Sequence, residues 1–487
     1  MDNKRDLRFV VIGAGMAGIL SGIKLLEAGQ RNFCIYEKAS KVGGTWRENT
    51  YPGLTCDVAA HAYTYSFEPN PDWSRYLAPG GEIQQYFERT VKKYGIDQYL
   101  KCNEEIVRCE YVGGRWQLET KSGTRDEADV VIAATGVLHK PSYPDIPGME
   151  QFSGAIFHSA RWDHSIPLDG QRVGIIGSGS TGVQIVSALS TRAQCLTHFQ
   201  RSAQWIMPVE NPVFSEEQKA AFRQDAALLK YMQNEPVYTE AVDRFNHAIA
   251  NPDSAEMHEI EAIVLKNLED SVADPQLREK LRPTYRAACK RLVFSTDYYV
   301  AIQRSNVALV TEGIAGIERS GVRTGDGVLH ELDVLVLATG FDAHAFMRPM
   351  NIVGRGGTSL DEVWEEGPSA YLSISMPEFP NFFMLNGPNG PVGNFSLIEI
   401  AEHQWHYIAQ LIELLQSGRC REVSVSQAAL EQFEKERVAA ARQTIFGSGC
   451  QSWYLDAQGV PATWPWDRQR FFEDMAQPDL AAFDLIE

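Results

Sequence analysis

Two glycine-rich turns, each following a short apolar segment, constrain the fold of this 487-residue chain more than any other feature. The first apolar segment, residues 9–12, runs directly into the turn Gly13–Gly18, which has the spacing GxGxxG. A helical pattern follows the turn, and a second apolar segment covers residues 33–38. This order of strand, glycine turn, helix and strand predicts a βαβ unit of the dinucleotide-binding type at the start of the chain.

The same pattern occurs a second time between residues 173 and 201. An apolar segment leads into the turn Gly177–Gly182, then into a helical pattern and a strand pattern that begins at residue 195. We therefore predict an α/β fold with two Rossmann-like dinucleotide-binding domains. Residues 209–288 are polar with helical spacing, and we interpret them as a helical insertion in the second domain.

Two further strand patterns, at residues 130–136 and 334–340, end in the same Ala-Thr-Gly. Each would return the chain to a parallel sheet, and if the second one joins the first sheet, the first domain is discontinuous. We accordingly expect the first part of the first domain at 1–143 and the second domain, with its insertion, at 144–333. The rest of the first domain and a C-terminal loop would then occupy 334–487.

The charge balance argues against a nucleic-acid partner. The chain has 45 basic and 63 acidic residues and a formal charge of −18, which is a poor match to a phosphate backbone. No stretch resembles a signal peptide or a membrane-spanning helix, so we expect a cytoplasmic protein with no membrane contact. The eight cysteines show no CxxC pair and no zinc-like spacing with histidine, so we expect reduced thiols and no metal site.

The first glycine turn has the features of a site for a dinucleotide with free ribose hydroxyls. Gly13 would permit the tight turn, Gly15 would let the backbone approach a pyrophosphate, and Gly18 would allow close packing of helix on strand. Glu37 lies 24 positions after Gly13, where a carboxylate accepts hydrogen bonds from a ribose diol. We predict FAD at this turn, with NAD as the alternative.

The second turn differs at the equivalent position, because 24 positions after Gly177 stands Arg201. A guanidinium there could pair with a 2′-phosphate, so we predict NADP(H), with a solvent-exposed structural charge as the alternative for Arg201. A protein that holds both cofactors would move a hydride between them and pass the electrons on. The chain lacks the CxxC or CxxxxC of the disulfide reductases, which leaves oxygen as the leading acceptor.

Two signatures then carry a resemblance to a known family. Residues 152–163 fit FxGxxxHxxxW[PD], and residues 43–57 fit [AG]GxWxxxx[FY]P[GM]xxxD, at every specified position. The chain therefore resembles the Baeyer–Villiger monooxygenases, which are class B flavoprotein monooxygenases. It departs from many members after Trp46, at Leu54-Thr55 and in the loop at 455–469. In these places it is similar to a short branch close to the core of 4-hydroxyacetophenone monooxygenase.

The resemblance implies a reaction and roles for several charged residues. NADPH would reduce FAD, the reduced flavin would capture O2 as a C4a-peroxide, and this peroxide would convert a ketone into an ester or lactone. Arg291 matches the catalytic arginine, which would stabilise the peroxide anion, and Asp57 matches the aspartate that holds it. Lys290 matches the residue that joins Arg201 on the 2′-phosphate. The alternatives are a turn cap for Asp57 and a structural ion pair for Arg291.

Two other functions remain open at the level of sequence. A sibling monooxygenase that oxygenates sulfides or amines would share every cofactor site, and a nucleotide-binding flavoprotein used for sensing would turn over slowly. The resemblance implies a ketone and O2 as substrates and a monomer or weak homo-oligomer.

The first signature falls on the segment between the two domains and comprises Phe152, Gly154, His158, Trp162 and Asp163. We expect His158 to anchor this segment and to couple domain rotation to the state of the cofactors. Direct acid–base chemistry by His158 and simple packing are the alternatives.

The motifs and the resemblance together give the full set of expected site residues. For FAD they are Gly13, Ala14, Gly15, Met16, Gly18, Glu37, Lys38, Gly44, Thr45, Trp46, Asp57, Tyr63, Ile106 and Ser396. For NADP they are Thr55, Ser178, Gly179, Ser180, Thr181, Gly182, Gln184, Arg201, Ser202, Lys290 and Arg291.

Overall fold

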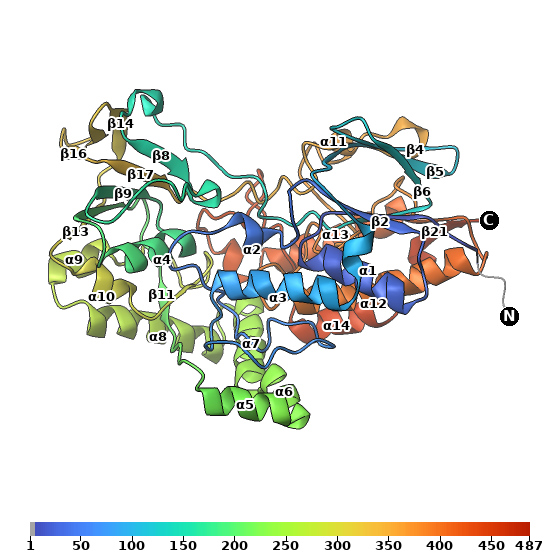
Figure 1. Ribbon diagram of the computed structural model, residues 1–487, viewed down its shortest axis with the longest axis horizontal. Helices are drawn as coiled ribbons and strands as arrows, with labels where there is room; N and C mark the ends of the chain where they lie inside the picture. The colour runs from blue at the N-terminus through green and yellow to red at the C-terminus, as the bar shows by residue number, and fades with distance from the viewer. Residues whose placement is uncertain (1–4) are drawn as a thin grey trace.

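The computed structural model describes residues 5–487 and has two lobes, each built around a five-stranded parallel sheet (Figure 1). A group of helices lies below both lobes in this view, and the chain crosses between the lobes more than once. The predicted α/β fold with two Rossmann-like domains is confirmed.

The first sheet has the strand order β19-β7-β1-β2-β3, and all of its pairs are parallel. Its strands are β1 (Phe9–Ile12), β2 (Phe33–Glu37), β3 (Leu100–Cys102), β7 (Val130–Ala133) and β19 (Phe382–Met384). β1 and β7 are buried along their whole length because they lie inside the sheet and helices cover it. Helix α1 (Met16–Glu27) packs on β1, and α12 (Leu397–Gln416) packs on α1. Continuous apolar segments are the pattern expected for strands covered in this way.

The second sheet repeats this arrangement with the order β13-β10-β9-β17-β8. Its strands are β8 (Ala155–His158), β9 (Arg172–Ile176), β10 (Cys195–Phe199), β13 (Val307–Val310) and β17 (Val334–Leu337). Helices α4 (Ser180–Leu189) and α10 (Tyr298–Ile302) pack against each other beside this sheet. As in the first sheet, the glycine turn lies between the first strand of the βαβ unit and its helix.

The expected domain boundary at 333/334 is wrong. Strand β17 pairs with β8 and β9 in the second sheet, with Val334 opposite both Ala155 and Val173. The strand that returns to the first sheet is β19, which pairs with β7. The first domain is therefore discontinuous, but its second part begins after residue 340. A buried strand pattern predicts a parallel strand without telling which of two similar sheets it joins.

The helical insertion consists of five helices within the range expected from the sequence. They are α5 (Glu216–Gln224), α6 (Ala226–Gln233), α7 (Pro236–Ala250), α8 (Ala255–Ser271) and α9 (Pro275–Lys280). Several start at typical N-caps: the Ser215 side chain caps α5, Asp225 caps α6 and Ser254 caps α8. Strands β11 (Ile206–Pro208) and β12 (Val293–Ser295) pair at its base and so close the insertion.

The remaining elements form smaller sheets and covering helices. β4 (Ile106–Val112), β5 (Arg115–Thr120), β6 (Arg125–Ala128) and β18 (Asn351–Val353) make one sheet. β14 (Ile314–Glu318), β15 (Gly321–Thr324) and β16 (Leu329–Glu331) make another, and β20 (Glu422–Val425) pairs with β21 (Phe483–Ile486). The other helices are α2 (Thr45–Glu48), α3 (Gly80–Lys93), α11 (Leu360–Val363), α13 (Gln427–Ala441) and α14 (Arg468–Ala476).

Two connections between the lobes, after β7 and after β17, run beside each other and are hydrogen-bonded together. Ser142 N donates to Gly340 O at 2.9 Å, and Thr339 Oγ1 donates to Ser142 O at 2.6 Å. Lys140 and Asp342 add an ion pair of 2.9 Å. Any rotation of one lobe against the other must therefore involve both connections together.

The expectation that all cysteines are reduced thiols is wrong for one pair. Cys289 and Cys450 form a disulfide with their Cα atoms 6.2 Å apart, and 161 positions separate them in the sequence. No local spacing pattern could reveal a pair so far apart. Within residues 5–487, no helix is long and apolar enough to cross a membrane.

Candidate active site

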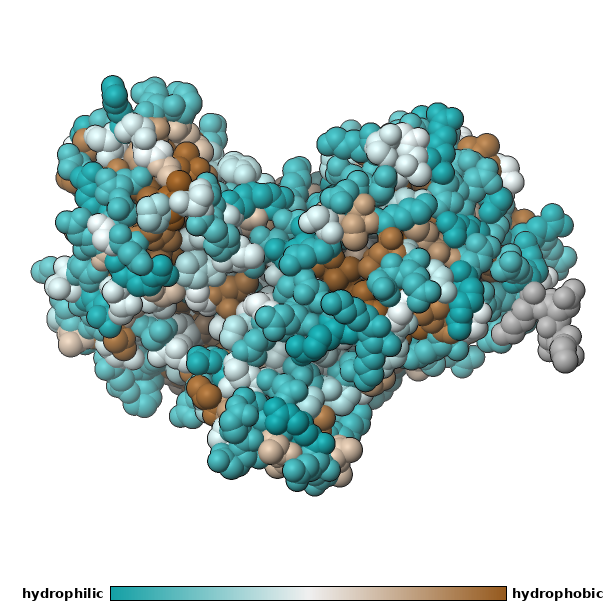
Figure 2. Space-filling model, viewed as in Figure 1, coloured by the Kyte–Doolittle hydropathy of each residue, from teal (hydrophilic) through white to brown (hydrophobic). Residues whose placement is uncertain are grey.

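A cavity of about 1790 Å³ lies between the two glycine turns and the helical insertion. Both turns, helices α7 and α8, and the two connections between the lobes all contribute to its wall. Figure 2 shows the molecule hollowed between its two upper lobes. A cavity of this size exceeds that of a typical small-ligand pocket and can hold more than one molecule.

The first glycine turn has the geometry that a pyrophosphate site requires. Gly13 has a φ of +100°, and a Cβ added there would lie 2.6 Å from Ala134 O. A Cβ at Gly18 would lie 1.9 Å from Gly13 O, so α1 approaches β1 as closely as only glycine allows. No side chain caps the N-terminus of α1, and Gly13, Gly15 and Met16 line the cavity. The turn therefore fits a dinucleotide at the positive end of a helix.

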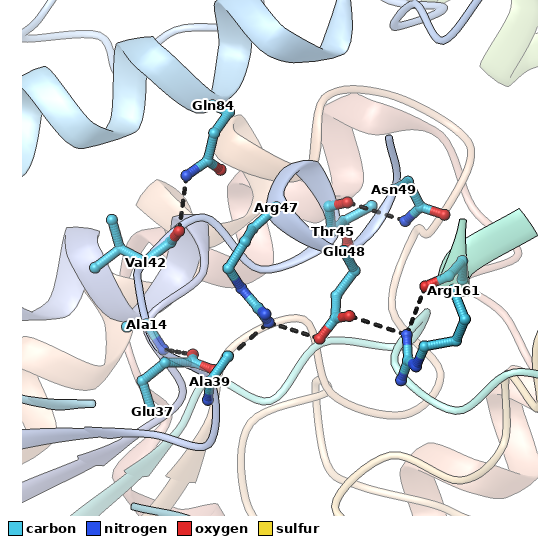
Figure 3. Close-up of polar contacts among 11 residues, drawn as sticks. Ala14, Glu37, Ala39, Val42, Thr45, Arg47, Glu48, Asn49, Gln84 and Arg161 are labelled. Atoms are coloured by element: carbon cyan, nitrogen blue, oxygen red, sulfur yellow. Dashed lines mark hydrogen bonds and ion pairs between the residues drawn. The ribbon is translucent and has the colours of Figure 1, made fainter. Parts of the chain in front are cut away.

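Glu37 lies at the end of β2 with its carboxylate held toward the turn (Figure 3). It is 4% exposed and accepts hydrogen bonds from Ala14 N at 2.8 Å and Ala39 N at 2.9 Å. Two backbone donors hold the side chain in one orientation, and each carboxylate oxygen keeps a further lone pair. Glu37 also lines the cavity, so it can accept hydrogen bonds from a ribose there.

A row of charged side chains runs from Glu37 to the segment between the lobes (Figure 3). Arg47 Nη2 lies 3.7 Å from Glu37 and 2.6 Å from Glu48. Glu48 in turn pairs with Arg161 at 2.9 Å. Arg161 belongs to the short 3-10 helix Ser159–Arg161, within the first sequence signature. The Glu37 carboxylate is thus connected by ion pairs to the segment that joins the two domains.

The other expected FAD residues surround the same part of the cavity, with one exception. Trp46 Nε1 donates to Tyr63 Oη at 3.1 Å, and burial holds the pKa of Tyr63 above its usual value. The lining residues among this set are Lys38, Gly44, Thr45, Trp46, Asp57, Tyr63 and Ile106. Ser396 is buried at the N-cap of α12 and is not part of the cavity wall in the described chain.

The second glycine turn repeats the geometry of the first. Gly177 has a φ of +116°, and a Cβ there would lie 2.2 Å from Ala338 O. A Cβ at Gly182 would lie 2.0 Å from Gly177 O. Ser178 Oγ donates to Ser202 O at 2.7 Å, which ties the turn to the segment after β10. The cavity-lining residues here are Ser178, Gly179, Ser180, Thr181, Gln184, Arg201 and Ser202.

Arg201 and Lys290 place two positive charges at the edge of the second turn. Burial and the nearby Arg201 charge lower the pKa of Lys290. The Lys290 ammonium lies 4.6 Å from the centre of the Tyr285 ring. Among residues 5–487, neither Arg201 nor Lys290 forms an ion pair with a carboxylate. Two neighbouring cations without an anionic partner are suited to a phosphate group.

Gln184 connects the two dinucleotide-binding domains directly. Its Oε1 accepts a hydrogen bond from Tyr51 Oη at 2.9 Å, and its Nε2 donates to Thr55 Oγ1 at 3.2 Å. Gly53 approaches so closely that a Cβ there would lie 2.7 Å from Gln184 O. The segment 51–55 of the first domain therefore lies against α4, beside the second turn.

Arg291 and Asp57 form an ion pair of 2.5 Å, and both line the cavity. Arg291 Nη1 also donates to Gly393 O at 3.5 Å. The Asp57 carboxylate, with the hydroxyl of Tyr454 nearby, holds the pKa of Arg291 above its ordinary range. Arg291 is therefore a permanent positive charge in a defined position on the cavity wall.

Comparison with known proteins shows the family to which the chain belongs. The sequence profile of the family described as flavin-binding monooxygenase-like matches residues 6–351. The chain belongs to this family. It is 46% identical over 459 residues to an uncharacterized monooxygenase of Mycobacterium tuberculosis, covering 93% of this chain and 91% of that one. It is 35% identical over 486 residues to a Baeyer–Villiger monooxygenase of Streptomyces coelicolor, covering 99% and 93% of the two chains.

A solved structure of a related enzyme has the same fold. Cyclohexanone monooxygenase from Rhodococcus sp. Phi1, bound to NADP+, has a TM-score of 0.87 and 29% identity, and the match covers 99% of both chains. The protein is therefore an FAD-containing, NADPH-dependent monooxygenase, with the cofactors expected from the two turns and the enzyme class implied by the two signatures.

In this flavin monooxygenase the first signature lies outside the cavity wall. His158 is 1% exposed; its Nδ1 accepts a hydrogen bond from Ala160 N at 3.1 Å, and its Nε2 donates to Gly340 O at 3.1 Å. Burial lowers the pKa of His158, in keeping with a neutral ring that uses one nitrogen as acceptor and the other as donor. His158 thus joins β8 to the connection after β17.

The other signature residues make contacts within the second domain. The Trp162 ring meets Phe157 edge to face at 5.0 Å, and a Cβ at Gly154 would lie 2.3 Å from Asp333 O. Phe152 is buried in the hydrophobic core of the second domain, and Asp163 accepts hydrogen bonds from Ser165.

The expected site residues do not include three residues of this monooxygenase that line or border the cavity. Tyr51 contacts Gln184, Tyr454 lies beside Arg291, and Asn394 is buried in the wall with a polar side chain. Tyr51 stands inside the second signature, which could have pointed to it. Nothing local in the sequence distinguishes Tyr454 or Asn394 from ordinary core residues.

Proposed function

We propose that the protein catalyses the NADPH- and O2-dependent Baeyer–Villiger oxidation of ketones to esters or lactones. The observation that carries the proposal is the ion pair of 2.5 Å between Arg291 and Asp57 inside the cavity that both glycine turns share. The similarity to the Baeyer–Villiger monooxygenase of Streptomyces coelicolor and to cyclohexanone monooxygenase supports the same reaction class.

In this proposal the first turn holds FAD and the second turn holds NADPH. The amides at the start of α1 bind the pyrophosphate of FAD, and Glu37 accepts hydrogen bonds from its ribose. Arg201 and Lys290 bind the 2′-phosphate of NADPH, with Ser178 and Thr181 at the turn itself. Bound FAD, once reduced by NADPH, would activate O2 for the transfer of one oxygen atom to the substrate.

The residues of the cavity wall then determine what this oxygen can do. Arg291 offers a planar, permanently charged group with several N–H donors, which stabilises negative charge on the reacting oxygen atoms. Asp57 keeps the guanidinium in place, so little reorganisation is needed when charge develops. The Arg291 and Asp57 side chains are only 32% and 24% exposed, and this partial burial strengthens the interaction of the charge with the reacting atoms.

We assign the first signature a positioning role away from the reacting atoms. His158 joins β8 to the connection after β17, and the row Glu37, Arg47, Glu48 and Arg161 leads from the proposed ribose site to the segment that follows β8. A change at either end therefore affects the orientation of the two domains.

The test is product analysis of the purified holoenzyme with NADPH, O2 and a panel of linear, cyclic and aryl ketones and one thioether. We expect products heavier than the ketone by one oxygen atom, with the fragmentation pattern of an ester or lactone. Oxygenation of the thioether alone would overturn the proposal in favour of a sulfide or amine monooxygenase. Slow NADPH oxidation with every compound would favour a nucleotide-binding sensor instead.

A further inference from the structure

The disulfide joins two segments of the cavity wall that lie far apart in the sequence. Cys289 directly precedes Lys290 and Arg291, and Cys450 directly precedes the segment 451–453; these neighbours of the two cysteines all line the cavity. The six other cysteines are free thiols. The disulfide of the described chain is therefore placed two positions from the proposed catalytic arginine.

A second contact attaches the same loop to Arg291. A Cβ added to Gly393 would lie 2.5 Å from Tyr454 Oη and 2.7 Å from Arg291 Nη1, so the hydroxyl and the guanidinium flank one point of the backbone. Tyr454 is 4% exposed, and its ring centre lies 4.3 Å from that of Phe446. The loop 450–454 is thus attached to the Arg291 segment at both ends, by the disulfide at one end and by the tyrosine hydroxyl at the other.

The backbone beside the disulfide has a conformation that local preference does not favour. Ala288 has a φ of +62°, in the left-handed region that residues with a Cβ rarely adopt. Ala288 belongs to the same hydrophobic cluster as Cys289, Cys450 and residues 445–446. Such a conformation persists only while the surrounding structure holds it. Without the disulfide, the segment that leads into Arg291 gains conformational freedom.

Cys450 lies close to the surface, whereas Cys289 does not. Residues 447–449 before Cys450 and Gln451 after it are exposed, and Trp453 is 39% exposed. Cys450 itself is 7% exposed, and Cys289 is fully buried. Because thiol–disulfide exchange depends on access to a sulfur atom, we expect a reductant to approach the bond from the side of Cys450.

We propose that the Cys289–Cys450 disulfide is a redox-sensitive positioning element for Arg291, and that its reduction by a dithiol lowers oxygen transfer. A thiolate of the dithiol attacks one protein sulfur and the S–S bond breaks; the second thiol of the reductant then resolves the mixed disulfide and closes a disulfide of its own. The dithiol loses two electrons and two protons, which the protein gains as the thiols of Cys289 and Cys450. The inference rests on the proposed Baeyer–Villiger function, in which Arg291 stabilises charge on the reacting oxygen atoms.

Opening the bond is expected to affect oxygen transfer and flavin reduction differently. Stabilisation of a developing charge requires a donor that is already held in place, and Arg291 would keep its ion pair with Asp57 but lose the fixed loop. Reducing equivalents that are not used for oxygen transfer leave as hydrogen peroxide, in the reaction NADPH + H+ + O2 → NADP+ + H2O2. Among the proposed NADP residues, Lys290 is next to the bond in sequence, so NADPH binding weakens as well, and saturating NADPH compensates for this.

The test compares the holoenzyme as purified with the holoenzyme treated with dithiothreitol under argon and then freed of reductant by gel filtration. Thiol counting after unfolding should give six thiols before treatment and eight after it. With a ketone that the untreated enzyme converts, the ester formed per NADPH is expected to fall about fivefold or more, with hydrogen peroxide making up the difference. The anaerobic rate of flavin reduction at saturating NADPH should stay the same.

Two variants and a reversal separate the disulfide from other effects of the reductant. Cys450→Ser cannot form the bond and should behave like the reduced wild type with or without dithiothreitol. Cys195→Ser removes an exposed free thiol and should respond to dithiothreitol as the wild type does. Reoxidation of the treated wild type by oxidised glutathione should restore the ester yield, and this measurement serves where Cys450→Ser does not fold.

The ester yield and the rate of flavin reduction together decide the inference. An unchanged ester yield per NADPH once all eight thiols are free would overturn it and leave the Baeyer–Villiger proposal intact. A fall in flavin reduction equal to the fall in ester would also overturn it, because it indicates a general loosening of the enzyme. Failure of dithiothreitol to open the bond in the folded enzyme has the same consequence. If the untreated enzyme forms no ester from any ketone, it is the proposed function itself that has failed.

Discussion

Asp57 and Arg291 are 234 positions apart in the sequence, yet they form an ion pair of 2.5 Å. Asp57 follows the first βαβ unit, whereas Arg291 follows the helical insertion of the second domain. The pair therefore exists only while the two domains keep this relative orientation. Because Lys290 precedes Arg291, the same segment also carries a charge for the proposed NADP site.

Replacing Arg291 by alanine should separate cofactor chemistry from oxygen transfer. Ester formation is expected to fall by about 100-fold or more, because removal of one preorganised donor from a reacting oxygen has an effect of that size. FAD content and the anaerobic rate of flavin reduction by NADPH should change by only a few-fold. Stopped-flow absorbance and product analysis measure the two effects. Ester formation near the wild-type rate would show that Arg291 has another role.

Replacing Arg201 by alanine should affect NADPH and NADH differently. Loss of a charge-assisted hydrogen bond of about 2 kcal/mol would raise the KM for NADPH roughly 30-fold. NADH has no 2′-phosphate, so its KM should change little. Steady-state kinetics with both nucleotides is the measurement, and Arg304→Ala, elsewhere in the second domain and outside the cavity wall, is the control. An equal loss for both nucleotides would refute the assignment of the 2′-phosphate to Arg201.

The disulfide between Cys289 and Cys450 should contribute to stability and reduce the number of free thiols. Unfolding the protein without reductant should expose two thiols fewer than its eight cysteines. Closing a loop of this length corresponds to up to about 5 kcal/mol, so Cys450→Ser should lower the free energy of unfolding clearly. Cys195→Ser removes an exposed free thiol and should have little effect. Detection of all eight thiols in the unfolded, unreduced protein would contradict the prediction.

His61 should make the protein less stable in acid. Its ring is 3% exposed, packs against Phe214 and Phe222, and has no hydrogen-bond partner for either nitrogen in the described chain. Burial lowers the pKa of His61 to about 4, below the value of about 6.5 for an unfolded histidine. Between these values the unfolded chain binds a proton that the folded protein does not, so stability falls as the pH falls.

The replacement His61→Phe tests this sign directly. It should leave the free energy of unfolding at pH 7.5 nearly unchanged and reduce the loss at pH 5 by roughly 2 kcal/mol. Urea unfolding at both pH values, followed by circular dichroism, measures the difference. The exposed His258, replaced by asparagine, is the control. An unchanged difference between the two pH values in His61→Phe would assign the acid sensitivity to other groups.

The sequence was sufficient to predict the local structure of several segments of this protein. Residues 9–12 form β1 as predicted, and both glycine turns have the close backbone contacts that only glycine permits. The contrast between Glu37 and Arg201 also follows from their positions after the turns. These features depend on strand and helix periodicity and on backbone conformation, which neighbouring residues determine.

The rest depends on contacts between residues that are far apart in the chain. No local sequence pattern indicates which sheet β17 joins or that Cys289 and Cys450 form a disulfide. Likewise, none indicates that Tyr454 lies beside Arg291. Asn394 likewise looks like any buried residue until it is found in the cavity wall. The sequence alone thus determined the two nucleotide-binding turns and their cofactor chemistry. Only the tertiary structure, through packing of the domains and the insertion around one cavity, decided which groups line that cavity.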